Sequence, residues 1–223
     1  MVARIYDFPD IPVSKQLFYA PGAAVEGGFT SGGVRMLSPE PGGRAYLDIQ
    51  PSMRMEWASP EGSWLMSQSN GKILRVRLTK TPQLVTSNQI AKPKGGTLGQ
   101  ADDRWKAPDA NNGLRGRYVA SALEGTTTVI IDMAPFGPIL KRGHVIGHGN
   151  HSYIVDDVTY SGASAVVTIN PPARKPIASG DYCEFEPWFL GTMLSGSDFR
   201  VTYDAENNGM MQLGKITLSE AII

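Results

Sequence analysis

A chain of 223 residues is long enough for one large β domain or two smaller ones with a proper core. Its 21 Lys and Arg residues balance 21 Asp and Glu residues, so the composition shows no electrostatic footprint for nucleic acid. The single cysteine, Cys183, excludes an internal disulfide and is compatible with folding in a reducing cytoplasm. No apolar run approaches the roughly 18–20 residues of a membrane span, and the N-terminus lacks the apolar core of a secretory signal, so we expect no membrane association.

Alternation of apolar and polar residues, which marks a strand with one buried face, recurs along the chain. In 72–78, for example, Leu74, Val76 and Leu78 would share the buried face. Turns rich in Gly and Asn separate such runs, and no long amphipathic helix is convincing, so the sequence predicts an all-β sandwich or barrel. In chain order, the predicted strands are 44–50, 72–78, 127–133, 164–170, 182–188, 198–204 and one within 210–223.

A polar segment over 85–117 interrupts this pattern. About 30 residues of weak periodicity indicate a domain boundary or a long functional loop. We therefore predict a β domain made of residues 1–85 and 195–223. A smaller β domain, 86–194, would be inserted into it and would begin with a long polar loop, 86–116.

All three histidines, His144, His148 and His151, fall in the stretch GHVIGHGNHSY. The stretch predicts a hairpin with strands at about 144–148 and 152–158, on which positions i and i+4 lie about 13 Å apart. Zinc ligands must converge at about 2.0–2.1 Å, so this hairpin favours solvent-facing polar residues over a metal site.

Other chemical signatures are weak. The chain has no nucleophile elbow, P-loop or zinc-protease motif. Glu184 and Glu186 would share a strand face, which favours a solvated face over a catalytic pair, and Cys183 is interpreted as a core or interface thiol. We predict no catalytic, cofactor-binding or metal-binding residues, and hence no enzyme.

The four tryptophans leave one alternative open. Trp57, Trp64, Trp105 and Trp188 could stack on sugars in a carbohydrate-binding module, although packing at a barrel end or a subunit seam is favoured. Three hypotheses thus remain: a structural protein, a glycan-binding module, and a metal-dependent hydrolase that uses the three histidines.

The order of short motifs resembles that of distal tail proteins of long-tailed, non-contractile bacteriophages and related gene-transfer particles. The motifs include FPDIP, FTSGGVRMLSPEPGGRAYLDI and LRVRLTKTPQL. The most specific part starts at Leu140-x-x-Gly143 and continues through a hairpin to VTINPPARKPIASGDYCEFEP. Here the residues that match the family pattern are Asn170, Pro171, Pro172, Arg174, Gly180 and Asp181, whereas His144 stands where the family often has Asp.

This resemblance implies a tube-like β-sandwich or barrel domain with a smaller inserted β domain. It further implies a homo-oligomeric ring, commonly of six subunits, at the distal end of the virion tail. The ring would join the tail tube protein to the hub and fibre proteins, and DNA would pass through its lumen without specific binding. The protein would fold in the host cytoplasm, without cofactor or catalysis.

Overall fold

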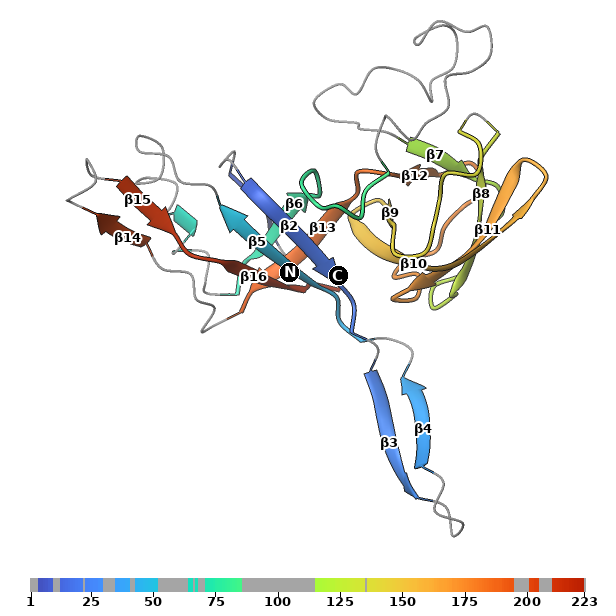
Figure 1. Cartoon of the computed structure of the whole chain (residues 1–223), viewed down its shortest axis with the longest axis horizontal. Coiled ribbons are helices and arrows are strands. Elements are labelled where there is room, and N and C mark those ends of the chain that lie inside the picture. The colour runs from blue at the N-terminus through green and yellow to red at the C-terminus, as the bar shows by residue number, and fades with distance from the viewer. Residues whose placement is uncertain are drawn as a thin grey trace, which may run out of the picture.

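The protein is described by a computed structural model, which is coloured along the chain in Figure 1. It describes residues 4–9, 13–21, 23–29, 35–40, 43–51, 64–65, 67, 71–85, 115–134, 136–194, 201–204 and 210–222. The predicted all-β class is confirmed, because nearly all regular structure in these residues is strand. No helix among the described residues has the length and apolar character needed to cross a membrane.

Six strands form one sheet, in which β1 is parallel to β6 and the other neighbours are antiparallel. The alternation predicted in the sequence sets its faces, since Leu47, Ile49 and Val76 are buried while their chain neighbours are not. In spatial order, the strands are β1 (Ile5–Asp7), β6 (Ile73–Arg77), β13 (Trp188–Met193), β16 (Ile216–Glu220), β5 (Tyr46–Pro51) and β2 (Val13–Tyr19).

The six-stranded sheet is rolled around its own core. Phe18 of β2 and Phe189 of β13 lie three places apart in the sheet, yet their rings meet edge to face at 5.8 Å. The buried side chain of Gln16 bridges the remaining gap between β2 and the end of β6. It donates to the Arg77 carbonyl at 2.9 Å and accepts from the N–H groups of Thr79 and Lys80.

A second group of six strands forms a closed barrel. Its core holds one continuous apolar cluster that includes Tyr118, Ile131, Phe136 and Phe185. Its strands, in closed order, are β10 (His151–Ser161), β11 (Ser164–Asn170), β8 (Thr128–Asp132), β7 (Arg115–Tyr118), β12 (Tyr182–Glu184) and β9 (Val145–His148).

The seam that closes the barrel lies between β12 and β9, where Glu184 pairs with Gly147. Gly147 is required here by close approach, because a Cβ atom at this position would collide with Pro187 and lie 2.9 Å from the His151 carbonyl oxygen. The absence of a side chain at residue 147 therefore allows the chain to cross from the barrel to the sheet at this point.

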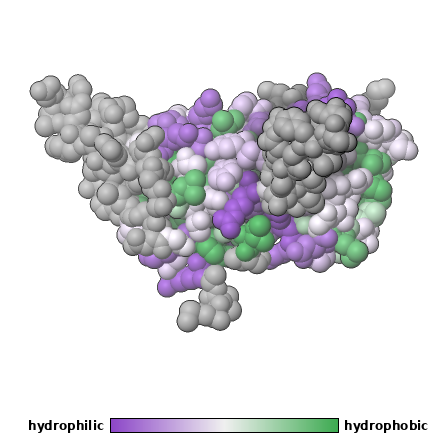
Figure 2. Space-filling model, turned by 90° about the horizontal axis from the view of Figure 1, so that it is seen from below, coloured by the Kyte–Doolittle hydropathy of each residue, from purple (hydrophilic) through white to green (hydrophobic). Residues whose placement is uncertain are grey.

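Two hairpins extend from the sheet. One, β3 (Ala23–Phe29) with β4 (Arg35–Glu40), continues from β2 and β5 and projects away from the rest of the molecule (Figure 1). The other, β14 (Val201–Asp204) with β15 (Met210–Leu213), precedes β16. Seen from below, the described surface mixes hydrophilic side chains with small separate apolar patches (Figure 2).

Several predicted boundaries differ from the structure. The predicted strand 182–188 ends at Glu184, and the chain enters the sheet as β13 at Trp188. The region 210–223, which was predicted to contain one strand, forms two strands, β15 and β16. The predicted insertion, 86–194, would include β13. In the structure, the six barrel strands lie between β6 and β13 in the chain, and β13 itself belongs to the six-stranded sheet. Arg115 and Gly116, assigned to the polar loop, are in β7, and residues 86–114 lie outside the described residues.

Candidate functional site

The histidine-bearing hairpin forms as predicted, with β9 and β10 joined at the pair His148 and His151. Its histidines, however, have separate surroundings. The ring of His144 accepts a hydrogen bond from the Lys141 N–H at 3.2 Å, and burial together with the Lys141 charge lowers the pKa of this imidazole. His148 Nε2 contacts Asp181 Oδ2 at 3.0 Å, and its ring meets Tyr118 edge to face.

The prediction that the histidines face solvent is wrong for His151, whose side chain is only 3% exposed. Its Nδ1 lies 3.9 Å from Glu220 Oε1, too far for a hydrogen bond, and neither ring nitrogen has a hydrogen-bond partner. Within the described ranges, no group of three or more His, Cys, Asp or Glu side chains could hold a metal ion. The geometry therefore gives the hydrolase hypothesis no converging ligands.

Glu220 belongs to a buried ion-pair junction between the barrel and the sheet. Arg174 follows β11 of the barrel and donates from Nε and Nη2 to the two carboxylate oxygens of Glu220, at 3.0 and 2.7 Å. Both side chains are at least 90% buried. Arg174 also donates to the Gly43 carbonyl, and the Ala45 N–H donates to Glu220.

This junction satisfies both carboxylate oxygens of Glu220, although the ring nitrogens of the adjacent His151 have no hydrogen-bond partner. Burial acts to raise the pKa of Glu220, but its contacts with His151, Arg174 and the Ala45 N–H outweigh burial and hold the pKa below its usual value. The Arg174 N–H also donates to the Tyr153 hydroxyl at 3.1 Å, and burial raises the pKa of Tyr153 to about 12. The junction thus fixes the barrel against the last strand of the sheet.

Other residues that match the family pattern also form hydrogen bonds or special backbone conformations within the protein. Asn170 is joined to Pro171 by a cis peptide bond, and its amide donates to the Ala20 carbonyl beside β2. Asp181 accepts from the Ala178 N–H and contacts His148. Gly180 adopts a φ of 91°, a conformation that glycine accepts without strain. The sequence positions behind the family resemblance therefore shape the barrel and its attachment.

Cys183 is a core thiol, as predicted. It is fully buried inside the barrel, and burial raises its pKa to about 12. Burial likewise raises the pKa of the neighbouring Tyr118 well above its usual value, and the Tyr118 hydroxyl donates to the Gly147 carbonyl. A thiol in this state is protonated and out of reach of solvent, so it cannot act as a nucleophile.

Glu184 ends β12 and Glu186 follows it, and both are only partly exposed, so they do not form the solvated strand face that was predicted. Burial raises the pKa of Glu184 to about 7, although Arg77, the Trp188 N–H and Arg115 oppose the shift. Glu186 accepts a hydrogen bond from Arg77 at 2.9 Å. Arg77 therefore lies close to both carboxylates, and Arg115 acts on Glu184 as well.

The described tryptophans pack against other side chains. Trp64 meets Tyr6 edge to face at 6.3 Å, and Trp188 stacks under the Arg75 guanidinium at 4.7 Å. Trp57 and Trp105 lie outside the described residues. Packing was the favoured interpretation, and it holds for these two rings.

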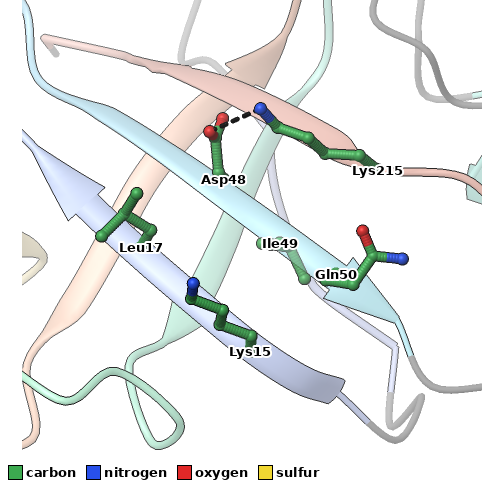
Figure 3. Close-up of a pocket in the computed structure, with 6 residues that line it drawn as sticks. All are labelled: Lys15, Leu17, Asp48, Ile49, Gln50 and Lys215. Atoms are coloured by element: carbon green, nitrogen blue, oxygen red, sulfur yellow. Dashed lines mark ion pairs between the residues drawn. The ribbon is translucent and has the colours of Figure 1, made fainter.

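A hollow of about 270 Å³ opens on the outer face of the sheet. Figure 3 shows Lys15 and Leu17 of β2 on one side of it, while Lys215 reaches Asp48 from the other; this ion pair measures 2.7 Å. The rings of Tyr19 and Tyr46 stack nearby at 5.5 Å on the same two strands. Sequence patterns predicted neither this hollow nor the ion-pair junction, since both combine residues far apart in the chain.

No protein-family model matches the chain, and a search of curated proteins gave no match either.

Proposed function

We propose that this protein is a structural component of a bacteriophage tail tip, a distal tail protein that forms a ring. On this proposal it has no catalytic role, and the ring joins the tail tube to the hub and fibre proteins around a channel for DNA. The proposal starts from the sequence resemblance, in which Asn170, Pro171, Arg174 and Asp181 match the family pattern.

The observation that supports it best is the rigid attachment of the barrel to the rolled sheet. A building block of a ring must hold its parts in fixed relative positions so that identical contacts close on themselves. Arg174 provides such a fixation, because it joins the barrel to Glu220 and Gly43 through buried, charge-assisted hydrogen bonds. Arg174, which matches the family pattern, thus holds the barrel in place on the sheet, as expected of a structural protein.

The projecting hairpin β3–β4 adds support. It is paired only within itself among the described strands, and a two-stranded hairpin alone is marginally stable in water. Contact with a neighbouring subunit or another tail protein would stabilise it.

The test is the oligomeric state and the location of the protein. Light scattering coupled to gel filtration should give a mass several times the 24.1 kDa of one chain, and negative-stain images should show rings with a central hole. An antibody against the chain should label one end of the tail in virions. A protein that is monomeric and also absent from tails would overturn the proposal.

A carbohydrate-binding module is the second candidate, and the hollow beside Tyr19 and Tyr46 favours it. Paired aromatic rings next to polar side chains such as Asp48 and Lys215 are typical of sugar-binding surfaces. It predicts glycan-dependent quenching of intrinsic fluorescence that Asp48→Asn weakens. A flat titration against a broad glycan panel would remove this candidate.

A further inference from the structure

A row of arginine, aromatic and carboxylate side chains follows residues 182–188, where the chain leaves β12 of the barrel and enters β13 of the sheet. Strand pairing sets its order, because β12 pairs with β7 and β13 pairs with β6. We call this set the arginine stripe. Its members are Tyr182, Glu184, Glu186 and Trp188 on the segment itself, with Arg115 and Arg117 of β7 and Arg75 and Arg77 of β6 beside it.

At the sheet end of the stripe, the positive charges are compensated. Arg75 pairs with Asp7 at 2.7 Å, and Arg77 pairs with Glu186 at 2.9 Å. Both guanidinium groups also lie over the Trp188 ring, at 4.7 and 5.9 Å from its centroid. This end therefore presents a half-buried tryptophan framed by neutralised arginines.

At the barrel end, two arginines enclose Tyr182, with guanidinium carbons 3.9 Å (Arg115) and 4.8 Å (Arg117) from the ring centroid. Arg117 donates to the Gly180 carbonyl and contacts the Tyr182 hydroxyl. Among the described residues, neither guanidinium forms an ion pair, and Arg115 has no hydrogen-bond partner. This end therefore carries positive charge that no close ion pair with a described residue neutralises.

Glu184 connects the two ends but compensates Arg115 only weakly. It interacts with both Arg77 and Arg115, and it accepts the Trp188 N–H. Because burial raises its pKa to about 7, the carboxyl is only partly ionised near neutral pH.

We propose that the arginine stripe is a docking surface for an extended acidic segment of another protein. A carboxylate of that segment pairs with Arg115, whose planar fork of N–H donors suits bidentate contact. An apolar residue of the segment packs on Trp188. Six residues of extended chain span about 20 Å, so a segment of similar length covers the stripe.

Charge and composition favour a polypeptide over nucleic acid. Arginine with aromatic rings also suits nucleic acid, but a nucleic acid carries a phosphate on every unit and would bring some of them against the carboxylates of Asp7 and Glu186. A peptide can place uncharged residues at those two positions. Tyrosine, tryptophan and arginine are the residues that contribute most to protein–protein binding energy. The proposal concerns a surface and not the ring, so it stands whether or not the protein forms one.

The test is fluorescence anisotropy of the full chain with three labelled probes. They are an eight-residue peptide alternating Glu and Leu, the same peptide with Gln in place of Glu, and an eight-nucleotide oligothymidylate. We expect the Glu peptide to bind at least about tenfold more tightly than the Gln peptide, in a salt-sensitive manner. Equal binding of both peptides, no binding of the Glu peptide, or tighter binding of the oligonucleotide would overturn the proposal.

Variants then locate the site. Arg115→Gln should weaken Glu-peptide binding by about tenfold, and Arg75→Gln, whose guanidinium is already paired with Asp7, should weaken it less. Arg142→Gln is the matched control, since it removes a guanidinium that is paired with Asp157 outside the stripe. If Arg142→Gln lowers the affinity as much as Arg115→Gln, the binding is a general charge effect and the stripe is not the site.

Discussion

The barrel closes through a complete ladder of strand pairs, whereas the six-stranded sheet is bridged by the side chain and one backbone hydrogen bond of Gln16 and is completed by the barrel. Each barrel strand pairs with two neighbours, and the described residues of the barrel core come from the barrel and its loops, apart from Val85. The sheet needs Gln16 to bridge its gap, and its core includes Val145 of β9 and packs against the partly buried Ile154 of β10.

The sheet therefore depends on the barrel more than the barrel depends on the sheet. A closed barrel has no open edge and can be stable alone, so the barrel should persist when the sheet is disturbed. The sheet loses part of its core when the barrel moves away, so it should not persist without the barrel. Three variants test this asymmetry, in order of decreasing effect, and a fourth tests the pH dependence of Glu184, where the chain leaves the barrel for the sheet.

The largest effect is expected at the ion-pair junction. Arg174→Ala leaves the Glu220 carboxylate buried without its partner, which should lower the free energy of unfolding by about 3–5 kcal/mol. Chemical denaturation should show it, and hydrogen exchange should rise first in the sheet. The double variant Arg174→Met/Glu220→Leu should cost clearly less, because it buries no unpaired charge. Equal losses in the single and double variants would contradict this account.

The barrel seam should be next. Gly147→Ala forces a methyl group against Pro187 and the His151 carbonyl, and overpacking of this kind costs about 1–3 kcal/mol. Because β9 also supplies Val145 to the sheet core, exchange should rise in both parts. An unchanged melting temperature would show that the seam can relax.

Removal of the bridge should disturb only the sheet. Gln16→Ala leaves the buried N–H groups of Thr79 and Lys80 without their acceptor, at a cost of about 1–3 kcal/mol. Amide exchange should rise in β2 and β6 but not in the barrel. Lys15→Ala, at the exposed neighbouring position, is the matched control and should change little. Faster exchange throughout the barrel would refute the asymmetry.

The smallest effect is expected at Glu184, and it depends on pH. The folded-state pKa of about 7 lies above the ordinary value of 4.5, so between these values the folded chain binds more protons and loses stability as pH rises. Glu184→Gln lacks this loss, so its stability relative to the wild type should increase from pH 4 to pH 8. After allowance for solvent screening, we expect a change of about 1 kcal/mol, measured by denaturation at both pH values. A difference that does not vary with pH would contradict the shifted pKa.

Local patterns in the sequence predicted several strands and their buried faces. Two-residue alternation predicted the β class, the strand 164–170 and the buried faces of Leu47 and Val76, because the pleat places successive side chains on opposite sides. It also predicted the histidine hairpin, since Gly149 and Asn150 make a tight turn between two short runs. It missed β1 and β2, which are short or carry charged residues between apolar ones.

The tertiary structure determines which distant segments come into contact. It buried His151, because the last strand of the sheet brings Glu220 beside the hairpin. It joined Arg174 to a carboxylate 46 residues away, and Gln16 to backbone groups more than 60 residues away. The two-residue periodicity of a strand predicts which of its faces is buried, but not what that face packs against. The packing partner depends on how the chain folds back on itself. This long-range packing forms the ion-pair junction, the barrel seam and the arginine stripe.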